Sequence, residues 1–300
     1  MELRQLATFS TLARTLNFTR AAALLNYAQS SVTAQIQALE EELGTPLFNR
    51  LGRRVTLTDA GQRFLSYAER VLALVDEGRS AVSSTEEMAG TLTIGAPETL
   101  CTYRLPALLH NYRVRYPAVH LSYRPAPVAD LRRRVSEGEL DVAFVMEELC
   151  ASASLTSELL VAEPVVVVSA VEHPLTQLTS VRPSDLRGMD VLLTEGGCSY
   201  RRLFERALAE IDVRPATLLE FNSIEAIKQC VISGMGISAL PAVAVAAEVA
   251  QGRLAELRWV GPALGVNTQM VWHRHRWLSP PLAAFLDLAR ETVTDARAAS

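Results

Sequence analysis

The sequence predicts an α/β protein made of a small helical head, one long connecting helix, and a larger region of strands alternating with helices. Three observations predict this fold class. Residues 18–42 fit a short helix followed by a longer one, and residues 65–82 carry apolar side chains at alternating steps of three and four. After Thr91, short β-rich runs alternate with helical stretches. A chain of 300 residues with 49% hydrophobic content can form two or three domains with buried cores.

The charge of the chain is unevenly distributed. The formal net charge is −4, yet from Met1 to Thr58 six arginines outnumber four glutamates. This balance argues against a general basic coat for nucleic acid, so any DNA binding must be local. The N-terminus has no apolar signal core, and the apolar run around residues 165–168 is too short to span a bilayer. We therefore expect a cytoplasmic protein without a membrane partner.

Cysteine spacing and short motifs exclude several classes of chemistry. The four cysteines, Cys101, Cys150, Cys198 and Cys230, are widely separated and form no C-x-x-C pair. The sequence also lacks a glycine-rich phosphate loop and a G-x-S-x-G nucleophile motif. We therefore expect no zinc site, no disulfide framework, no cofactor and no enzymatic activity.

The head begins with a helix over residues 3–16, whose apolar positions Leu6, Phe9, Ala13 and Leu16 form a floor for two later helices. Thr19 is the expected N-cap of the second helix, and a tight turn follows at residues 26–28. In the third helix one buried stripe is expected from Val32, Ile36, Leu39 and Leu43, which recur at steps of four, three and four.

The side chains on the opposite face of this third helix are short, and those at its N-terminal end are uncharged. Small side chains and amides can approach base edges in a major groove, which favours DNA reading over an ordinary solvated face. The residues expected to contact DNA are Gln29, Ser30, Ser31, Thr33, Ala34 and Gln37, with Thr19 and Arg20 on the preceding helix.

A small hairpin is predicted after the third helix. Residues 47–50 and 55–58 read as two short strands around a turn at residues 51–54. Arg50, Arg53 and Arg54 are candidate phosphate or minor-groove contacts, which position a protein on the duplex without reading sequence. A solvated turn is the alternative.

A long helix follows, capped at residues 58–59 and running to about Met88. A heptad seam is predicted from Leu65, Ala68, Leu72, Val75, Arg79 and Val82. We expect its partner to be the same helix of a second chain, giving a homodimer or homotetramer with two reading helices about 34 Å, or a multiple of that, apart. Packing against the chain's own later domain is the alternative.

The segment FTRAAALLNYAQSSVTAQIQALEEE, continued by LGTPLFNRLGRRVTLTDAGQRFL, resembles the winged helix-turn-helix head of the LysR-type transcriptional regulators. The similarity extends along the chain, since this family joins such a head by a long dimerising helix to a ligand-sensing domain of this size. It implies a DNA-binding regulator whose promoter binding or activation responds to a small-molecule effector. Many members carry arginine where this chain has Ala34, which would instead suit a thymine methyl group.

Beyond Thr91 the alternation implies parallel sheets flanked by helices. The expected strands are residues 92–95, 119–123, 141–145, 164–168, 191–194, 217–221, 236–239 and 268–272. The expected helices are residues 105–115, 129–137, 200–211 and 223–233.

By the resemblance, this part is a two-lobed, periplasmic-binding-protein-like α/β effector domain with a ligand cleft at a hinge of two crossing strands. The expected domains are a head at residues 1–58, a linker helix at 59–89 and an effector domain at 90–300. Lobe 1 comprises residues 90–161 and 268–300, and lobe 2 comprises residues 162–267.

Three strand-to-helix segments, at residues 97–102, 194–200 and 221–223, can bring free backbone N–H groups to such a cleft. They suit a small carboxylate or a similar polar metabolite. The candidate effector contacts are Thr99, Cys101, Thr102, Cys198, Ser199, Tyr200, Phe221 and Asn222. Thr99 and Ser199 have the alternative role of capping their own helices.

Cys198 supports a second hypothesis, a thiol redox sensor, because it lies at a helix N-terminus beside Arg201 and Arg202. Peroxide-sensing members of the family pair such a cysteine with a second one close behind, whereas here the next is Cys230. A small residue lining the cleft is the simpler interpretation. The aromatic and basic cluster at residues 272–277 is not interpreted as a metal site, because no third ligand follows at a suitable spacing.

The expected partners are double-stranded promoter DNA, a small-molecule effector and a second copy of the chain, with RNA polymerase as a further candidate. A solute-binding or enzymatic α/β protein with an incidental helical hairpin is the alternative from a different class.

Overall fold

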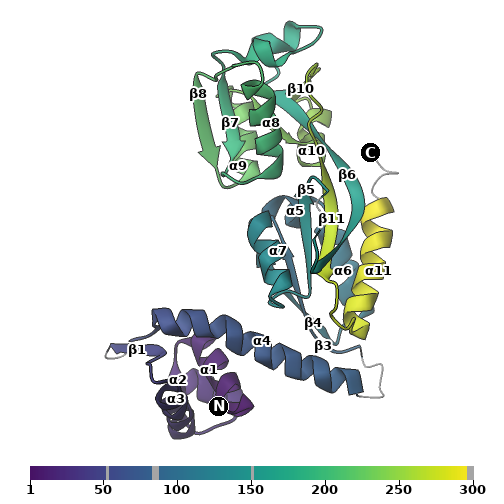
Figure 1. Cartoon of the computed structure of the whole chain (residues 1–300). Coiled ribbons are helices and arrows are strands. Elements are labelled where there is room, and N and C mark those ends of the chain that lie inside the picture. The colour runs from purple at the N-terminus through teal and green to yellow at the C-terminus, as the bar shows by residue number, and fades with distance from the viewer. Residues whose placement is uncertain (52–53, 83–87, 150–151, 296–300) are drawn as a thin grey trace. The chain divides into compact units, whose positions relative to one another are not determined.

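The computed structural model describes residues 1–51, 54–82, 88–149 and 152–295. The described residues fall into two compact units, an N-terminal one that includes helix α4 and a C-terminal one that includes strand β3 (Figure 1). Among them, no helix combines the length and apolarity needed to cross a membrane.

The N-terminal unit is a three-helix head with a hairpin and one long helix. Its helices are α1 (Leu3–Thr15), α2 (Phe18–Leu25), α3 (Gln29–Leu43) and α4 (Asp59–Val82), and the strands β1 (Phe48–Leu51) and β2 (Arg54–Leu57) pair antiparallel. Phe9 of α1 is fully buried and contacts the rings of Phe48 and Phe64 at centroid distances of 5.4 and 5.2 Å. Helix α1, the hairpin and α4 therefore share one core.

Two details of the head differ from expectation. The N-cap of α2 is Asn17, whose side chain accepts a hydrogen bond from Arg20 N at 3.0 Å, so the predicted cap at Thr19 is wrong. Leu16 and Leu43 are exposed and do not complete the predicted apolar stripes, because each lies at the end of its helix where the chain turns away. Leu12 is buried in α1 instead.

The first part of the predicted seam of α4 packs on the head of the same chain, not on a second chain. Ala68 is 1% exposed and belongs to the head core, with Leu65 and Leu72 packed against it. Among the side chains of α4 that the structure describes, the large apolar ones that are exposed are Tyr67, Val71 and Leu74. Val75 is half-buried, the side chains of Arg79 and Val82 are not described, and the predicted end of the helix near Met88 falls on residues outside the described ones.

The cap of α4 is confirmed. Thr58 Oγ1 accepts a hydrogen bond from Gly61 N at 2.9 Å and donates one to Pro46 O at 2.8 Å. A Cβ at Gly61 would lie 2.1 Å from Leu47 O, so only glycine permits this close approach of helix and hairpin.

The C-terminal unit contains a seven-stranded sheet in the order β10-β6-β11-β5-β3-β4, with β9 also paired to β6, and a separate pair β7-β8. The strands are β3 (Gly90–Ala96), β4 (Val119–Pro125), β5 (Val142–Glu147), β6 (Leu155–Ser169), β7 (Asp190–Thr194), β8 (Thr217–Phe221), β9 (Ser238–Pro241), β10 (Ala255–Leu257) and β11 (Gly265–His273). The helices are α5 (Glu98–Tyr103), α6 (Leu105–Arg115), α7 (Val128–Ser136), α8 (Ser199–Ala209), α9 (Ile224–Ile232), α10 (Ala242–Ala250) and α11 (Pro280–Asp295), with 3₁₀ turns η1 (Pro174–Gln177) and η2 (Pro183–Leu186).

Strands β6 and β11 connect the two lobes of this unit (Figure 1). The first part of β6 pairs with β11, and its last residues pair with β9 and β10. The chain leaves the first lobe on β6 and returns on β11, so these strands run antiparallel. The large sheet is therefore mixed. Among the strands that the structure describes, the parallel pairs are β3 with β4 and β5, and β7 with β8.

The C-terminal helix α11 completes the first lobe. Phe285 is fully buried against Tyr112 of α6 and Phe144 of β5, at ring-centroid distances of 5.1 and 6.1 Å. The Tyr112 hydroxyl donates to Pro281 O at 2.7 Å. The last segment of the chain is thus anchored to the lobe in which the C-terminal unit begins.

Candidate functional site

The predicted DNA-reading residues of α3 lie on its exposed side. Gln29, Ser30, Ser31, Ala34 and Gln37 are exposed, whereas Val32, Ile36 and Leu39 hold the helix on the head core. The face opposite the core thus carries no charged side chain over the first turns of the helix.

Hydrogen bonds order the start of this surface. Thr19 of α2 donates its hydroxyl to Gln29 Oε1 at 3.3 Å, which brings the exposed N-terminal ends of α2 and α3 together. Thr33 is half-buried and donates to Gln29 O at 3.0 Å, so its hydroxyl is already engaged by its own helix. Arg20 is exposed on α2.

The hairpin arginines are only partly placed. Arg50 pairs with Val55 and Arg54 with Leu51 across β1 and β2, but the side chains of Arg50 and Arg54 are not described. Arg53 lies outside the described residues.

Glu40 has a role that the sequence reasoning missed. Its Oε1 accepts hydrogen bonds from the backbone N–H groups of Leu47 and Phe48 at 2.8 and 3.1 Å. The carboxylate therefore fixes the hairpin to the end of α3. A glutamate three residues before the end of α3 carries no local signal of this use.

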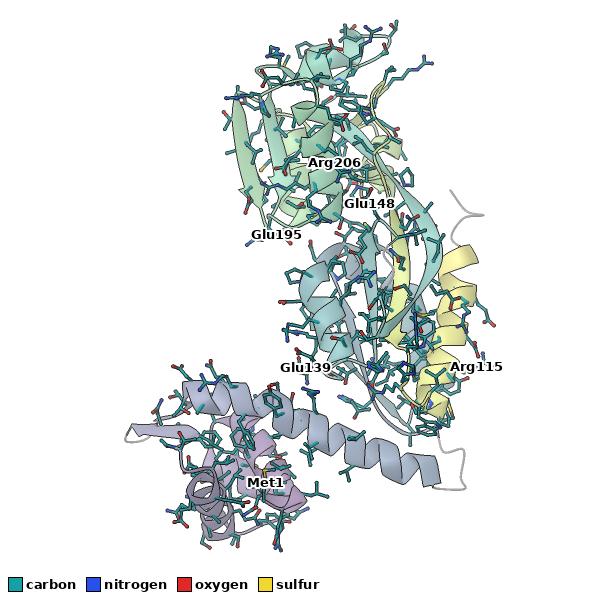
Figure 2. The ribbon with its side chains drawn as sticks, in the orientation of Figure 1. Met1, Arg115, Glu139, Glu148, Glu195 and Arg206 are labelled. Atoms are coloured by element: carbon teal, nitrogen blue, oxygen red, sulfur yellow. The ribbon has the colours of Figure 1, made fainter. Side chains whose placement is uncertain are left out.

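A cavity of about 60 Å³ lies between the two lobes of the C-terminal unit. Its lining residues are Pro97, Glu98, Thr99, Pro127, Val128, Met146, Thr194, Glu195, Gly196, Gly197, Cys198, Ser199, Tyr200, Asn222 and Ile224. Figure 2 labels Glu195 at the edge of the second lobe that is nearest the first. The cavity thus contains five of the predicted effector contacts: Thr99, Cys198, Ser199, Tyr200 and Asn222.

The remaining predicted contacts lie elsewhere. Cys101, Thr102 and Phe221 are not among the lining residues, since Cys101 and Thr102 belong to the turns of α5 beyond Thr99, and Phe221 ends β8 just before the cavity wall. The sequence reasoning missed the apolar wall of Pro127, Val128 and Met146.

Two helices direct their N-terminal ends at this cavity. Cys198 is the N-cap of α8 and Ser223 that of α9, and neither side chain makes a capping hydrogen bond. The N-cap of α5 is Pro97, so neither Thr99 nor Ser199 is the cap of its own helix. At the start of α8, free N–H groups and the helix dipole favour an anion, whereas at the start of α9 the Ile224 N–H already donates to Glu98 Oε2 at 3.5 Å.

The inner end of the cavity is polar and buried. Tyr200 is 4% exposed, and burial, with the nearby Cys198 as the next cause, raises the pKa of its phenol well above the usual value. Thr194 is 5% exposed, and its hydroxyl lies near Tyr200 but has no hydrogen-bond partner of good geometry among the described residues. A buried hydroxyl without a partner is unfavourable unless a ligand or water satisfies it.

Arg201, which bonds the backbone of the lining residue Thr194, is already paired. Arg201 donates to Thr194 O and forms ion pairs with Glu205 at 2.8 Å and Glu220 at 2.6 Å. The only charged side chains that line the cavity, within the described residues, are the carboxylates of Glu98 and Glu195.

Direct contacts join the lobes beside the cavity. Glu98 Oε2 of α5 accepts a hydrogen bond from Ile224 N at the start of α9, at 3.5 Å. Tyr103, at the other end of α5, donates its hydroxyl to Glu225 of α9. The Lys228 ammonium lies 5.3 Å from the Tyr103 ring centroid and forms an ion pair with Glu225 at 2.7 Å.

A buried ion pair lies at the crossing strands. Arg104 forms two hydrogen bonds of 2.7 Å with the carboxylate of Glu163 on β6, which is 1% exposed. Thr268 of β11 donates to the same carboxylate at 3.1 Å. One acidic side chain therefore connects α5, its neighbour α6 and both strands that link the lobes.

Neither a metal site nor a disulfide is found in the described part of the chain. It contains no group of three or more histidine, cysteine, aspartate or glutamate side chains arranged for a metal, and Cys101, Cys198 and Cys230 are free thiols.

Two family profiles match the chain. Residues 3–62 match the bacterial regulatory helix-turn-helix protein of the lysR family, and residues 85–294 match the LysR substrate binding domain. The chain belongs to the LysR family of transcriptional regulators. Regulators of this family bind DNA, form oligomers and are not enzymes, so the alternative of a solute-binding or enzymatic protein is wrong.

Curated relatives align with the LysR regulator over nearly its full length. The transcriptional regulator YwqM of Bacillus subtilis is 46% identical over 97% of this chain and 99% of its own. GltR, a transcriptional regulator of the same organism, is 35% identical over 97% of both.

Solved structures agree with this assignment. A variant of full-length OxyR from Pseudomonas aeruginosa gives a TM-score of 0.74 at 26% identity, covering 98% of this chain and 94% of that one. Full-length CbnR in complex with its target DNA gives 0.66 at 26% identity, covering 97% and 100%. The predicted family and the predicted fold class, a helix-turn-helix head joined to a two-lobed α/β effector domain, are confirmed.

Proposed function

We propose that this LysR regulator reads promoter DNA with α3 and that a small effector in the interlobe cavity changes its binding or activation. The base-contacting residues are Gln29, Ser30, Ser31, Ala34 and Gln37, with Thr33 supporting the first turn through its bond to Gln29. Their exposure and lack of charge, on a helix held by a buried opposite face, support this role.

Neighbouring residues position the head on the duplex. Thr19 and Arg20 at the start of α2 lie beside the start of α3, where backbone N–H groups and a guanidinium suit phosphate. Arg50, Arg53 and Arg54 of the hairpin contact phosphates or the minor groove. The CbnR complex with its target DNA supports the same mode of binding here.

Self-association places two heads on one operator. The exposed side chains Tyr67, Val71 and Leu74 recur at steps of four and three, which forms one apolar stripe along α4. A second copy of the same helix buries it. In this arrangement residues 1–58 form the head, 59–89 the linker, and 90–300 the effector domain, with lobes at 90–161 plus 268–300 and at 162–267.

The effector occupies the cavity lined by Thr99, Cys198, Ser199, Tyr200 and Asn222. The observation that carries this assignment is the start of α8, which has no side-chain cap, beside the unsatisfied hydroxyl of Thr194. Such a site favours a small polar molecule with an anionic group, for example a carboxylate. Because both lobes supply lining residues, a ligand can change the lobe arrangement by binding one arrangement more tightly.

Oxidation of Cys198 is a second candidate signal. Cys198 is the N-cap of α8 and lines the cavity, and the OxyR variant resembles this chain over most of its length. Peroxide treatment of the parent and of Cys198→Ser, followed by DNA-binding measurements, distinguishes the two signals. An equal response in both proteins would exclude the thiol.

Selection of duplexes from a random-sequence library by the purified full-length protein tests the regulator function. We expect enrichment of an inverted repeat and binding that weakens steeply as salt concentration rises. Recovery of no common sequence at any salt concentration would contradict specific promoter recognition.

A further inference from the structure

The interlobe cavity has an unusual charge arrangement for a site that binds a simple carboxylate. Within the described residues, its charged lining side chains are Glu98 from α5 of the first lobe and Glu195 from the loop before α8 of the second. Two carboxylates at one cavity repel an anion and favour a cation. A ligand that carried only negative charge would meet this repulsion from both lobes.

The α8 end of the cavity has the opposite preference. This helix of 11 residues starts without a side-chain cap, so its first N–H groups face the cavity with the positive end of the helix dipole. Arg202 lies within 3.5 Å of the Ser199 hydroxyl on the same helix. An anionic group is therefore stabilised at Ser199.

Thr194 provides an independent indication of a ligand. Its hydroxyl is at least nine-tenths buried, belongs to a lining residue and lacks a hydrogen-bond partner of good geometry in the described structure. A ligand oxygen or nitrogen beside Thr194 would satisfy this group. The helix end and the unsatisfied hydroxyl thus mark one polar subsite, and the two carboxylates mark another.

The neighbouring cations do not neutralise these carboxylates. Arg201 is held by Glu205 and Glu220, and Lys228 by Glu225 and by Glu248 at 2.9 Å. Both belong to other ion pairs. Glu98 Oε2 accepts a long hydrogen bond of 3.5 Å from Ile224 N, and neither Glu98 nor Glu195 is paired with these two cations, so their negative charge can attract a cationic group on the ligand.

We infer that the effector is a small zwitterion of the α-amino-acid class, with its carboxylate at the start of α8 and its ammonium between Glu98 and Glu195. This inference rests on the proposed function, since it names the ligand of the same cavity. The space of about 60 Å³ corresponds to roughly four to six water positions, which suits a short side chain. An ammonium shared by carboxylates of both lobes also relieves their repulsion, so binding favours closure.

Binding to the purified full-length protein tests the class directly. Calorimetric titration and thermal shift would compare the standard L-amino acids with matched acids that lack the amine: glycolate for glycine, lactate for alanine and glycerate for serine. We expect at least one small amino acid to bind roughly tenfold or more tightly than its hydroxy acid. Ethylamine, which lacks the carboxylate, should bind far more weakly than the amino acid.

Charge-neutral variants provide the matched test. Glu98→Gln combined with Glu195→Gln keeps the side-chain size and should reduce the preference for the amino acid over the hydroxy acid to about one. Glu195→Gln alone should reduce this preference partly. Because Glu195 is exposed, the single variant should fold even if the double variant does not, so the test remains decisive. Glu256 is an exposed glutamate outside the cavity, and Glu256→Gln changes the net charge by the same amount as Glu195→Gln. This control should leave the preference for the amino acid over the hydroxy acid unchanged.

The outcomes distinguish a failure of the amino-acid inference from a failure of the proposed function. A hydroxy acid that binds the parent protein as tightly as its amino acid would overturn the zwitterion and leave a carboxylate effector in place. Absence of binding by every acid and every amino acid would overturn both the class and the proposed carboxylate effector, while DNA selection by the same protein would still report on the regulator.

Discussion

Tyr103 of the first lobe donates a hydrogen bond to Glu225 of the second, and the Lys228 ammonium lies 5.3 Å from the centroid of the same Tyr103 ring. This contact, with that of Glu98 to Ile224 N, lies beside the interlobe cavity. Burial and the hydrogen bond to Glu225 raise the pKa of Tyr103 to about 12, so the phenol stays protonated and able to donate at neutral pH. Helix α5 thus forms two hydrogen bonds with α9 of the other lobe.

We predict that Tyr103→Phe favours a more open lobe arrangement. The substitution keeps the ring beside Lys228 and removes only the hydrogen bond to Glu225, at a cost of about 1 kcal/mol to the closed arrangement. Hydrogen exchange at the start of α9 should become faster in the variant. Unchanged exchange there, with a folded protein, would show that the contact does not hold the lobes.

Removing Arg104 should be more damaging. Arg104→Met leaves the Glu163 carboxylate buried with only Thr268 as a partner, which costs about 3–5 kcal/mol. Urea unfolding followed in the C-terminal unit measures this loss. The double variant Arg104→Met with Glu163→Leu should recover much of it, because no charge is then left buried. Equal stability of parent and single variant would contradict the arrangement.

Two faces of α4 should respond differently to a charge. Ala68→Glu places a carboxylate in the head core, so the head should unfold or lose several kcal/mol of stability. Leu74→Glu, at an exposed position, should leave the head folded and weaken self-association. Analytical ultracentrifugation and circular dichroism together distinguish the effects. A dimer of unchanged affinity in Leu74→Glu would move the interface away from this stripe.

The loss of folding stability at acid pH should depend partly on Glu158. Hydrogen bonds of 2.9 Å from Arg290 are the main cause that lowers its pKa, so the carboxylate contributes stability above the ordinary pKa, which is lost as pH falls through the lowered value. Glu158→Gln should lower Tm by about 1–3 °C at pH 7 and by less near pH 3. A difference in Tm that grows toward acid pH would have the wrong sign.

Sequence patterns within single helices and strands were sufficient to predict much of the fold. Helix α6 occupies the predicted residues, and the stripe of Val32, Ile36 and Leu39 is buried as predicted, because period and local propensity determine which face is apolar. The same pattern does not identify the partner of that face. Leu65, Ala68 and Leu72 fit a coiled-coil seam as well as they fit the head core that they actually contact.

The lining residues of the cavity could be predicted only where the local sequence pattern indicates a strand-to-helix turn. Strand-to-helix segments rich in glycine and hydroxyl groups pointed to Thr99, Cys198, Ser199, Tyr200 and Asn222. Pro127, Val128 and Met146 gave no such signal, since an apolar residue facing a cavity resembles one facing a core. Contacts between lobes, such as Tyr103 with Glu225, depend on residues more than 100 positions apart and have no local pattern.

The most direct test of the central claim, that the uncharged face of α3 reads base edges, is the ratio of affinities for selected and random duplexes. Gln29→Ala, Ser30→Ala and Gln37→Ala combined should weaken binding to the selected duplex by roughly 10–100-fold and leave binding to random duplex nearly unchanged. Gln251→Ala, exposed in the C-terminal unit, serves as the control and should keep the parent's ratio. A triple variant that keeps the parent's ratio would contradict the account.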